Sequence, residues 1–459
     1  MAKMTSELLL SYYADDFTGS TDVMEALALG GVRTVLFLAP PSAELLEARF
    51  RGIRAFGIAG VSRSLSPAEM EAELGPVFAC LHASGTPVVH YKMCSTFDSS
   101  PDIGSIGKAA ELGRAAFGGA HPIPLLVGAP ALGRYTVFGN HFAKGGETVH
   151  RLDRHPTMSR HPVTPMDEAD LRMHLAKQTK LSVGLMDILA MEGDEASAAE
   201  RLKRLLAEGP ELVLFDVLDD ERLERAGALL WQEAVERDSR FVIGSSGVEY
   251  ALCAHWRRTG LTEPDVTLFE ARGPVKQLFA VSGSCSPVTE AQIGYALANG
   301  FRGIPVDVER LVVPDEAEAY RSKLREEALA VLGDGSSPLL YTALGPENLQ
   351  TERLRSRMAN AGHASLDTGR LLGEQLGKLT REVVGTAGLQ RFLIAGGDTS
   401  GYVTRELGIY GLECLMPVAP GGPLCLSHAE NPAFDGKELA LKGGQVGTED
   451  YFVRVRDGR

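Results

Sequence analysis

Short apolar runs alternate with helical patterns along almost the whole of this 459-residue chain. Such alternation is typical of α/β layering, in which helices connect the strands of a sheet. Residues 195–208 and 222–236 have the periodicity of amphipathic helices. The expected strands are residues 34–38, 55–58, 87–91, 124–127, 212–215 and 241–243, followed by 277–282, 303–306, 338–341 and 391–395. The sequence therefore predicts the α/β class.

The chain is too long for one ordinary hydrophobic core, so more than one domain is expected. Residues 257–276 form the weakest stretch in its middle and contain Gly260, Pro264, Gly273 and Pro274. Such a stretch between a helix and a new strand is typical of a linker. We expect domains at residues 1–258 and 277–459, joined by a linker at 259–276. Each should be an open α/β domain, with the active site in the cleft between them.

The composition narrows the choice of partners. A net charge of -14 argues against nucleic acid or an anionic membrane, although a local basic pocket can still bind an anionic substrate. Residues 1–7 lack a signal-peptide core, and no run of about 18 apolar residues occurs, so a cytoplasmic protein is expected. The 6 cysteines include no C-x-x-C pair, which disfavours a zinc cage or a disulfide framework.

Two carboxylates mark the first candidate site. Residues 8–13 are expected to form a strand and residues 21–29 a helix, with Asp15 and Asp16 between them. Open α/β sheets bind ligands at this end of a strand. The carboxylates can accept hydrogen bonds from sugar hydroxyls, and free N–H groups at residues 18–20 can hold an anion. The alternative is that Asp15 and Asp16 only cap the helix.

Further polar residues follow two neighbouring expected strands. Lys92 is a compact cation for a carboxylate or phosphate, and Arg63 adds a second cation. Ser95 and Asp98 can contact hydroxyls. The alternative is an ordinary capped loop. Residues 151–161, rich in Arg and His, are either a surface charge run or a basic lid over an anionic substrate.

Glycine-rich loops in the second half are candidates for phosphate binding. Residues 396–401 read Gly-Gly-Asp-Thr-Ser-Gly between an expected strand and a helix at 402–407, although a glycine turn with a helix cap explains them equally. Residues 282–287 repeat the strand–Gly/Ser–helix pattern. Residues 442–447 suggest a hairpin turn or the rim of a purine pocket. The chain contains no Walker A, G-x-G-x-x-G or G-x-S-x-G motif.

These motifs resemble the four-carbon acid sugar kinases, a two-domain bacterial family, over essentially the whole chain. The shared segments are residues 14–20 (ADDFTGS), 92–100, 282–286, 396–399 and 442–444. The resemblance implies that the N-terminal domain binds the acid sugar and the C-terminal domain binds ATP. The implied substrate-binding residues are Asp15, Asp16, Arg63, Lys92, Ser95 and Asp98. The implied ATP-binding residues are Ser282, Ser284, Gly396, Gly397, Asp398, Thr399, Gly443 and Gly444.

One segment departs from the family pattern. Many members carry D-S-T-x-R-G-N after the lysine, whereas residues 94–100 here read Cys-Ser-Thr-Phe-Asp-Ser-Ser. Because the arginine of that pattern is missing, the acid is expected to differ from threonate or erythronate. An oxo acid or a branched acid such as 3-oxo-isoapionate is expected instead.

The sequence thus predicts an ATP-dependent kinase that phosphorylates a terminal hydroxyl of a short sugar acid. Mg²⁺ is expected on the ATP phosphates rather than in a protein cage. Either Asp16 or Asp398 is the catalytic base that orients the hydroxyl, and the sequence does not choose between them. The alternative is a sugar-acid sensor without phosphoryl transfer, which would not need residues 396–399. An oxidoreductase is disfavoured by the missing Rossmann motif. Sugar acid and ATP are the expected partners, and a homodimer stays open.

Overall fold

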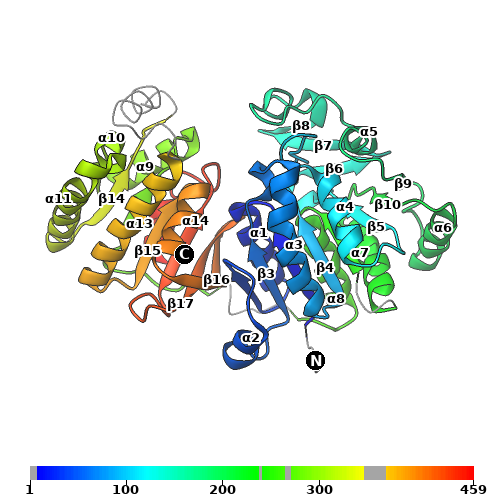
Figure 1. Cartoon of the computed structure of the whole chain (residues 1–459), viewed down its shortest axis with the longest axis horizontal. Coiled ribbons are helices and arrows are strands. Elements are labelled where there is room, and N and C mark those ends of the chain that lie inside the picture. Colours follow the sequence, from blue (N-terminus) through cyan, green and yellow to red (C-terminus); the bar gives the residue numbers. More distant parts are fainter. Residues whose placement is uncertain (1–7, 237–239, 264–269, 346–367) are drawn as a thin grey trace. The chain divides into compact units, whose positions relative to one another are not determined.

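The structure is a computed structural model that describes residues 8–236, 240–263, 270–345 and 368–459 (Figure 1). It divides into two compact units, Met1–Asp265 and Val266–Arg459. Both units are α/β, which confirms the predicted class. The division falls within the expected linker, of which residues 264–269 lie outside the described residues. The predicted inter-domain cleft stays a prediction.

The first unit is built on a parallel sheet. Strand β1 (Leu10–Ala14) is buried at every residue, because helices cover both faces of such a sheet. A Cβ on Gly57 would lie 2.0 Å from the ring of Tyr12, so the neighbouring strand can carry only glycine there. In sheet order the strands are β2 (Thr34–Phe37), β3 (Ala55–Ala59), β1, β4 (Val88–Lys92), β11 (Arg240–Gly244), β5 (Ile123–Leu126), β10 (Leu212–Phe215) and β9 (Val183–Met186).

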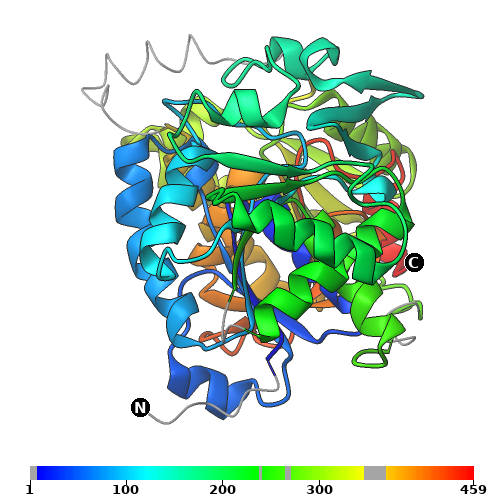
Figure 2. The ribbon, with the colours of Figure 1, turned by 90° about the vertical axis from the view of Figure 1, so that its right-hand side faces the viewer.

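Helices of the first unit lie on both sides of its strands (Figure 2). Helix α1 (Phe17–Leu29) connects β1 to β2 and contacts β2, β3 and helix α8 (Gly247–Arg258). Helices α3 (Pro67–Ala83) and α4 (Ile106–Ala116) pack together against β1 and β11. Every helix in the following list except α8 begins after an N-cap side chain of Ser or Asp that accepts a backbone N–H, which stabilises its first turn. The helices are α1 (Phe17–Leu29), α2 (Ala43–Arg49), α3 (Pro67–Ala83), α4 (Ile106–Ala116), α5 (Leu171–Leu175), α6 (Glu195–Ala207), α7 (Asp220–Val235) and α8 (Gly247–Arg258).

A small antiparallel sheet is inserted between β5 and β9. It consists of β6 (Arg134–Val137), β7 (Asn140–Gly145) and β8 (Thr148–Arg151). Thr136 pairs with Val217, just after the end of β10, and His141 contacts the backbone of Ser95, just after the end of β4. The small sheet therefore lies over the carboxyl ends of the parallel strands, which is the ligand-binding edge of such a fold.

The second unit contains a mixed sheet and its own core. Its strands in sheet order are β13 (Phe301–Pro305), β14 (Ser337–Tyr341), β12 (Phe279–Ser282), β15 (Arg391–Ala395), β18 (Glu438–Lys442), β17 (Gly422–Ala429) and β16 (Ile409–Ala419). The first five are parallel, and β16 and β17 form an antiparallel hairpin. The helices are α9 (Pro287–Ala298), α10 (Val308–Val312), α11 (Pro314–Gly333), α13 (Thr368–Ala387), α14 (Gly397–Glu406) and α15 (Tyr451–Asp457).

One buried arginine joins the two ends of the second unit. Arg391, in β15, forms an ion pair with Glu438 at 2.6 Å. Its Nη1 also donates to the carbonyl groups of Gly273, Val455 and Arg456. Gly273 lies near the start of the unit and the other two residues lie in its last helix. Within the described residues, no helix of either unit is both long and apolar enough to cross a membrane.

Candidate active site

The polar residues of the first unit follow three neighbouring parallel strands. Ala14, the last residue of β1, pairs with Ala59 of β3 on one side and with Lys92 of β4 on the other. Asp15 and Asp16 follow β1 directly, and Arg63 lies in a 3-10 turn (Ser62–Ser64) after β3. The sheet register therefore brings these predicted site residues to one level at the carboxyl edge.

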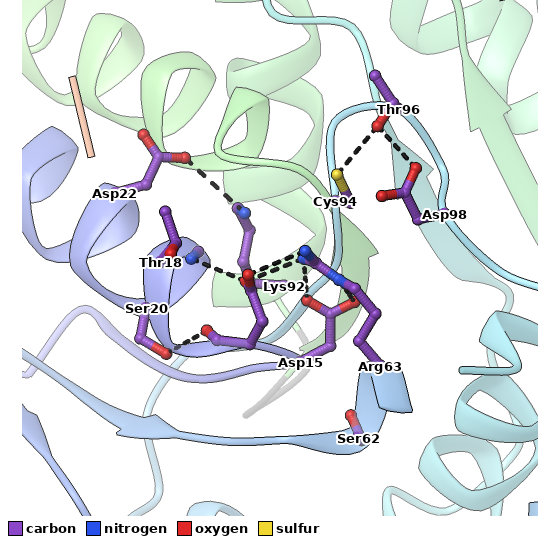
Figure 3. Close-up of polar contacts among 12 residues, drawn as sticks. Asp15, Thr18, Ser20, Asp22, Ser62, Arg63, Lys92, Cys94, Thr96 and Asp98 are labelled. Atoms are coloured by element: carbon purple, nitrogen blue, oxygen red, sulfur yellow. Dashed lines mark hydrogen bonds and ion pairs between the residues drawn. The ribbon is translucent and has the colours of Figure 1, made fainter. Parts of the chain in front are cut away.

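Arg63 binds both carboxylates at once, and Figure 3 shows its contact with Asp15. Its Nη2 donates to Asp15 Oδ1 at 2.6 Å and to Asp16 Oδ1 at 2.9 Å. Its Nε donates to Asp15 Oδ2 at 3.1 Å, and its Nη1 donates to Asp16 Oδ2 at 2.9 Å. Burial raises the pKa of Asp15, and the Arg63 charge opposes that rise. The guanidinium thus holds two adjacent carboxylates in a fixed arrangement.

Asp16 has a second role as the N-cap of α1. Its Oδ1 accepts the N–H of Gly19 at 2.8 Å, and its carbonyl accepts the N–H of Ser20. The helix begins at Phe17 and not at Thr21, so the expected loop at residues 18–20 is the first helical turn. The prediction of free N–H groups at Gly19 and Ser20 is therefore wrong. The capping alternative is correct for Asp16, in addition to its contact with Arg63.

Lys92 points toward Asp22, a residue that the sequence analysis missed. Lys92 is 3% exposed, and its Nζ lies 3.8 Å from Asp22 Oδ2 in α1 (Figure 3). Burial raises the pKa of Asp22, and Lys92 opposes the rise. A Cβ on Gly19 would lie 3.0 Å from Lys92 Nζ, so this glycine lets the ammonium approach α1. The spacing of Asp22 from Gly19, one helical turn, is the signal that could have indicated it.

The segment after β4 forms a short chain of polar contacts. Thr96 Oγ1 donates to Asp98 Oδ1 at 2.8 Å, and Cys94 Sγ lies 3.0 Å from Thr96 Oγ1. Burial raises the pKa of Cys94 to about 11, so its thiol is protonated at neutral pH. Ser95 contributes its carbonyl group to a contact with His141 of β7.

His141 fixes this segment to the small sheet. Its Nε2 lies 2.8 Å from the Ser95 carbonyl, and its Nδ1 lies 3.0 Å from Thr136 Oγ1. The carbonyl can only accept, so Nε2 donates and Nδ1 accepts from the hydroxyl. Burial lowers the pKa of His141 to about 4, and the imidazole is therefore neutral at pH 7. In residues 151–161, Arg151 pairs with Asp153 and His155 accepts backbone N–H groups, so these side chains make local contacts.

The second candidate cluster lies in the second unit, where three loops follow three adjacent parallel strands. Ser282 of β12 pairs with Ala395 of β15, which pairs with Lys442 of β18. The Gly283 N–H donates to the Ala395 carbonyl at 3.0 Å, and the Gly396 N–H donates to the Lys442 carbonyl at 2.9 Å. We call the segments 282–286, 396–399 and 442–444 the three-loop cluster.

Helix α14 opens directly onto the three-loop cluster. It begins at Gly397, whereas the sequence predicted a start near Tyr402. Its N-cap, Gly396, has a φ of 124°, which only glycine adopts without strain, and no side chain caps the first turn. Asp398 is exposed in that turn. An uncapped helix N-terminus presents N–H groups and a positive dipole end to an anion.

Glycine residues let the segments of the three-loop cluster lie close to one another. A Cβ on Gly283 would lie 2.1 Å from Thr399 Oγ1, and a Cβ on Gly444 would lie 2.9 Å from Ser284 Oγ. Ser284 Oγ accepts the N–H of Ser286 at 3.2 Å. All eight expected ATP-binding residues thus lie in the three-loop cluster, whose loops contact one another. The hairpin alternative for the 442–447 segment is wrong, because this segment leads from β18 into α15.

A metal cage was not expected from the sequence. In the ranges that the structure describes, no group of three or more His, Cys, Asp or Glu side chains could hold a metal ion. The exposed carboxylate of Asp398, in the three-loop cluster, is a single ligand group of the oxygen type that Mg²⁺ prefers.

The chain matches known proteins in both of its units. Residues 10–252 match a family described as a sugar-binding N-terminal domain, and residues 279–452 match one described as a nucleotide-binding C-terminal domain. A 3-oxo-isoapionate kinase of Paraburkholderia graminis is 46% identical over 98% of this chain and 95% of its own length. A 3-oxo-tetronate kinase of Pectobacterium atrosepticum is 31% identical over 97% of this chain and 98% of its own.

Solved structures show the same fold. A Salmonella typhimurium LT2 protein, provisionally described as a tRNA synthase, superposes with a TM-score of 0.76 at 27% identity, covering 97% of this chain and 98% of that one. A Haemophilus influenzae protein from a domain family of unknown function gives a TM-score of 0.73 at 25% identity, covering 97% and 99%. Together with the two domain matches and the two kinases, these likenesses show that the chain belongs to the four-carbon acid sugar kinase family.

Proposed function

We propose that the chain transfers the γ-phosphoryl group of ATP to a terminal hydroxyl of a short oxo sugar acid. The protein is a sugar-acid kinase, and the observation that carries this conclusion is the 46% identity to a 3-oxo-isoapionate kinase over 98% of the chain. We propose residues 1–258 as the acid-binding domain, residues 277–459 as the ATP-binding domain, and the cytoplasm as the location. A homodimer stays a prediction.

The three-loop cluster has the properties that nucleotide phosphates require. Helix α14 has no side-chain cap, and a Cβ on Gly397, its first residue, would have no neighbour within 4 Å, so the first turn is open to a ligand. The N–H groups of such a turn bind phosphate without any Walker A lysine motif. We propose that Ser282, Ser284, Gly396, Gly397, Asp398, Thr399, Gly443 and Gly444 line the ATP site.

The carboxylate cluster of the first unit has the chemistry to bind a polyhydroxylated acid. Carboxylate oxygens of Asp16 and Asp98 accept hydrogen bonds from substrate hydroxyls, while Arg63 and Lys92 supply positive charge. Asp98 stands where many relatives carry an arginine, which supports a substrate other than threonate or erythronate. We propose Asp15, Asp16, Arg63, Lys92, Ser95 and Asp98 as the substrate-binding residues.

We assign different roles to the two candidate bases. Asp16 lies among the substrate-binding residues and can orient the attacking hydroxyl. Its contact with Arg63 fixes the position of the carboxylate, and phosphoryl transfer depends more on positioning than on proton abstraction. Asp398 lies in the first turn of α14, where its charge would repel a phosphate unless a cation lay between them. We therefore propose that Asp16 is the base and that Asp398 contacts Mg²⁺, which when bound with ATP neutralises phosphate charge.

A coupled ADP-release assay tests the function. Purified protein is supplied with ATP, Mg²⁺ and each member of a panel of four- and five-carbon aldonic, 3-oxo and branched 3-oxo acids. We expect turnover with a 3-oxo acid and a product whose phosphate lies on the terminal carbon by ³¹P-coupled NMR. Tight acid binding without any ADP release would instead indicate a sensor and would overturn the proposal.

A further inference from the structure

Lys442 differs from the other buried cations of the chain. Four lysine and arginine residues are buried in the described ranges: Lys92, Arg240, Arg391 and Lys442. The first three have a carboxylate partner at 3.8, 3.8 and 2.6 Å respectively. Lys442 is 2% exposed, and among the described residues it forms no ion pair. Burying a cation without a counter-charge is unfavourable, so this position requires an explanation.

The contacts of Lys442 place its ammonium group against α9, at the edge of the three-loop cluster. Its Nζ donates to Thr289 Oγ1 at 2.9 Å, and Thr289 Oγ1 in turn donates to the Gly444 carbonyl at 2.9 Å. Lys442 is aligned with Ser282 and Ala395 across the sheet. Its backbone carbonyl accepts the N–H of Gly396, the N-cap of α14. The lysine thus shares one site with an uncapped helix N-terminus.

We propose that a phosphate of bound ATP is the missing counter-charge of Lys442. This inference rests on the proposed nucleotide site and adds a cation to it. A contact with Thr289 needs only a neutral donor, whereas the ammonium is a compact positive charge that can also bind an anion. Desolvation lowers the pKa of Lys442 to about 8, and a phosphate nearby would raise it again.

Nucleotide binding by a Lys442→Met variant tests the pairing. Methionine keeps the length of the side chain and removes the charge, so the fold should be retained, which circular dichroism checks. By calorimetry, affinity for ATP and ADP should fall about ten- to a hundredfold, as expected for a charge-assisted contact, while adenosine affinity stays unchanged. Lys323→Met, which removes an exposed lysine of α11, is the matched control and should bind all three ligands normally.

Proton uptake gives a second readout that a structural role would not produce. At pH 8 about half of the Lys442 side chains are neutral in the free protein, given a pKa of about 8. The phosphates of ADP are already ionised at this pH, so ADP binding should draw in about half a proton per site. Calorimetry in two buffers of different ionisation enthalpy measures this, and Lys442→Met should abolish it.

The outcomes of these experiments distinguish a failure of the proposed nucleotide site from a failure of the role proposed for Lys442. If the wild-type protein binds no ATP, the proposed nucleotide site itself is wrong. If wild-type protein binds ATP but Lys442→Met loses adenosine and ATP equally, or loses neither, only the role of Lys442 is overturned. Selective loss of ATP and ADP together with loss of proton uptake supports it.

A second cation, Arg134, is argued from a different observation. Arg134 and Thr136 lie on the same face of β6, because residues two apart on a strand share a face. Thr136 contacts His141, which reaches the Ser95 carbonyl, so this face is turned toward the segment after β4. Arg134 interacts electrostatically with Asp98 of that segment, and its buried Nε has no hydrogen-bond partner in the described residues.

We infer that Arg134 binds the carboxylate of the sugar acid. Arg134 comes from β6, and it would take the role of the arginine that many family members carry in the segment at residues 94–100. Its Nη1 donates to the carbonyl groups of Leu132, Gly133 and Lys144, which leaves Nε and Nη2 as donors for a ligand. This inference rests on the proposed sugar-acid site and identifies the residue that selects for an acid.

Selectivity for the acid tests this role. With Arg134→Met, KM for the acid should rise about tenfold or more, while KM for the primary amide of the same acid, which lacks the charge, stays unchanged. Arg154→Met, which removes an exposed arginine after β8, is the control and should retain the preference for the acid. An equal loss with acid and amide, or no loss, would show that Arg134 only supports the small sheet. If neither protein turns over any acid, the proposed function fails instead.

Discussion

Arg63 Nη2 lies 2.6 Å from Asp15 Oδ1, and the same guanidinium contacts both oxygens of Asp16. The nearby charges are three carboxylates, Asp15, Asp16 and Asp22, and two cations, Arg63 and Lys92. The cluster therefore has an excess of acceptors over positive charge. Such a site suits the hydroxyl end of a substrate better than its carboxylate end, which agrees with Asp16 as the residue that orients the attacking hydroxyl.

Replacing Arg63 should damage both stability and substrate binding. Arg63→Met leaves the buried Asp15 carboxylate without its cation, which should lower the free energy of unfolding by about 3 kcal/mol. Urea denaturation at pH 7 measures this change. Arg63→Lys keeps the charge but not the two-pronged contact, and should lie between wild type and Arg63→Met in both stability and kcat/KM. Equal values for all three proteins would contradict the structural role of the contact.

Substitutions of Asp16 and Asp398 should change different kinetic parameters, because the two residues are assigned different roles. Asp16→Asn should lower kcat at least a hundredfold at saturating Mg²⁺, because the amide cannot accept a proton. Asp398→Asn should mainly raise the Mg²⁺ concentration required for half-maximal rate, since the amide oxygen is a weaker ligand. Initial rates over a grid of Mg²⁺ and acid concentrations distinguish the two effects. The reverse pattern would exchange the two roles.

A side chain on Gly397 should block nucleotide phosphates without disturbing the fold. A Cβ there has no heavy atom of the described structure within 4 Å, so Gly397→Val should unfold at nearly the wild-type temperature. Its branched side chain would cover the N–H groups of the first turn of α14, and KM for ATP should rise tenfold or more. Gly385→Val, in α13 and equally free of neighbours, is the control. Unchanged ATP kinetics in Gly397→Val would remove this loop from the site.

His141 should make stability depend on pH in the acidic range. Its pKa is about 4 in the folded protein against about 6.5 when unfolded, so the unfolded chain binds more protons between these values. Stability from this group is complete above pH 6.5 and falls by about 3 kcal/mol as the pH drops to 4. Denaturation curves of His141→Gln, which cannot be charged, should have a shallower slope than wild type between pH 6.5 and 4. Parallel slopes would show that His141 does not carry this effect.

The buried pair of Arg391 and Glu438 should be costly to break on one side. Arg391→Met leaves Glu438 with only its longer contact to Arg272, at 3.5 Å, and removes three contacts to carbonyl groups, so unfolding of the second unit should become about 3 kcal/mol easier. Adding Glu438→Leu to Arg391→Met should recover part of this loss, because the carboxylate that has lost its shorter ion pair is then removed. Calorimetric unfolding of both variants measures the difference. A double variant less stable than the single one would contradict this account.

The regular part of the fold could be predicted because it depends on local sequence pattern. The predicted strands at residues 212–215 and 391–395 agree with β10 and β15 residue for residue. The starts of α1 and α14 were predicted too late, because Thr, Gly and Ser favour loops over helices. Neither the small sheet of β6, β7 and β8 nor the hairpin of β16 and β17 was predicted. In these strands the alternation of apolar and polar residues is interrupted by glycines and by additional polar residues. The pairing of these strands is decided by tertiary contacts and not by the local sequence.

The candidate site was easiest to predict where residues stand at the end of a strand. Lys92 ends β4, and Asp15, Asp16 and Gly396 come directly after strands, so the α/β pattern pointed to them. Asp22, Arg134 and the unpaired charge of Lys442 were missed. Asp22 reaches Lys92 from inside a helix, and Arg134 comes from the unpredicted small sheet. The burial of Lys442 depends on loops that are distant from one another in sequence.

The contacts of Arg391 also bring the two ends of the second unit close together. Its first described turn, at Gly273, and its last helix, at Val455 and Arg456, meet at one guanidinium group. A short peptide could therefore join these ends, and new termini could be opened elsewhere, as in other domains whose ends lie together. The exposed turn at Gly335, where a Cβ would meet no neighbour within 4 Å, offers such an opening away from the three-loop cluster. Such a circularly permuted second unit should therefore keep the three-loop cluster although its elements follow one another in a different order along the chain.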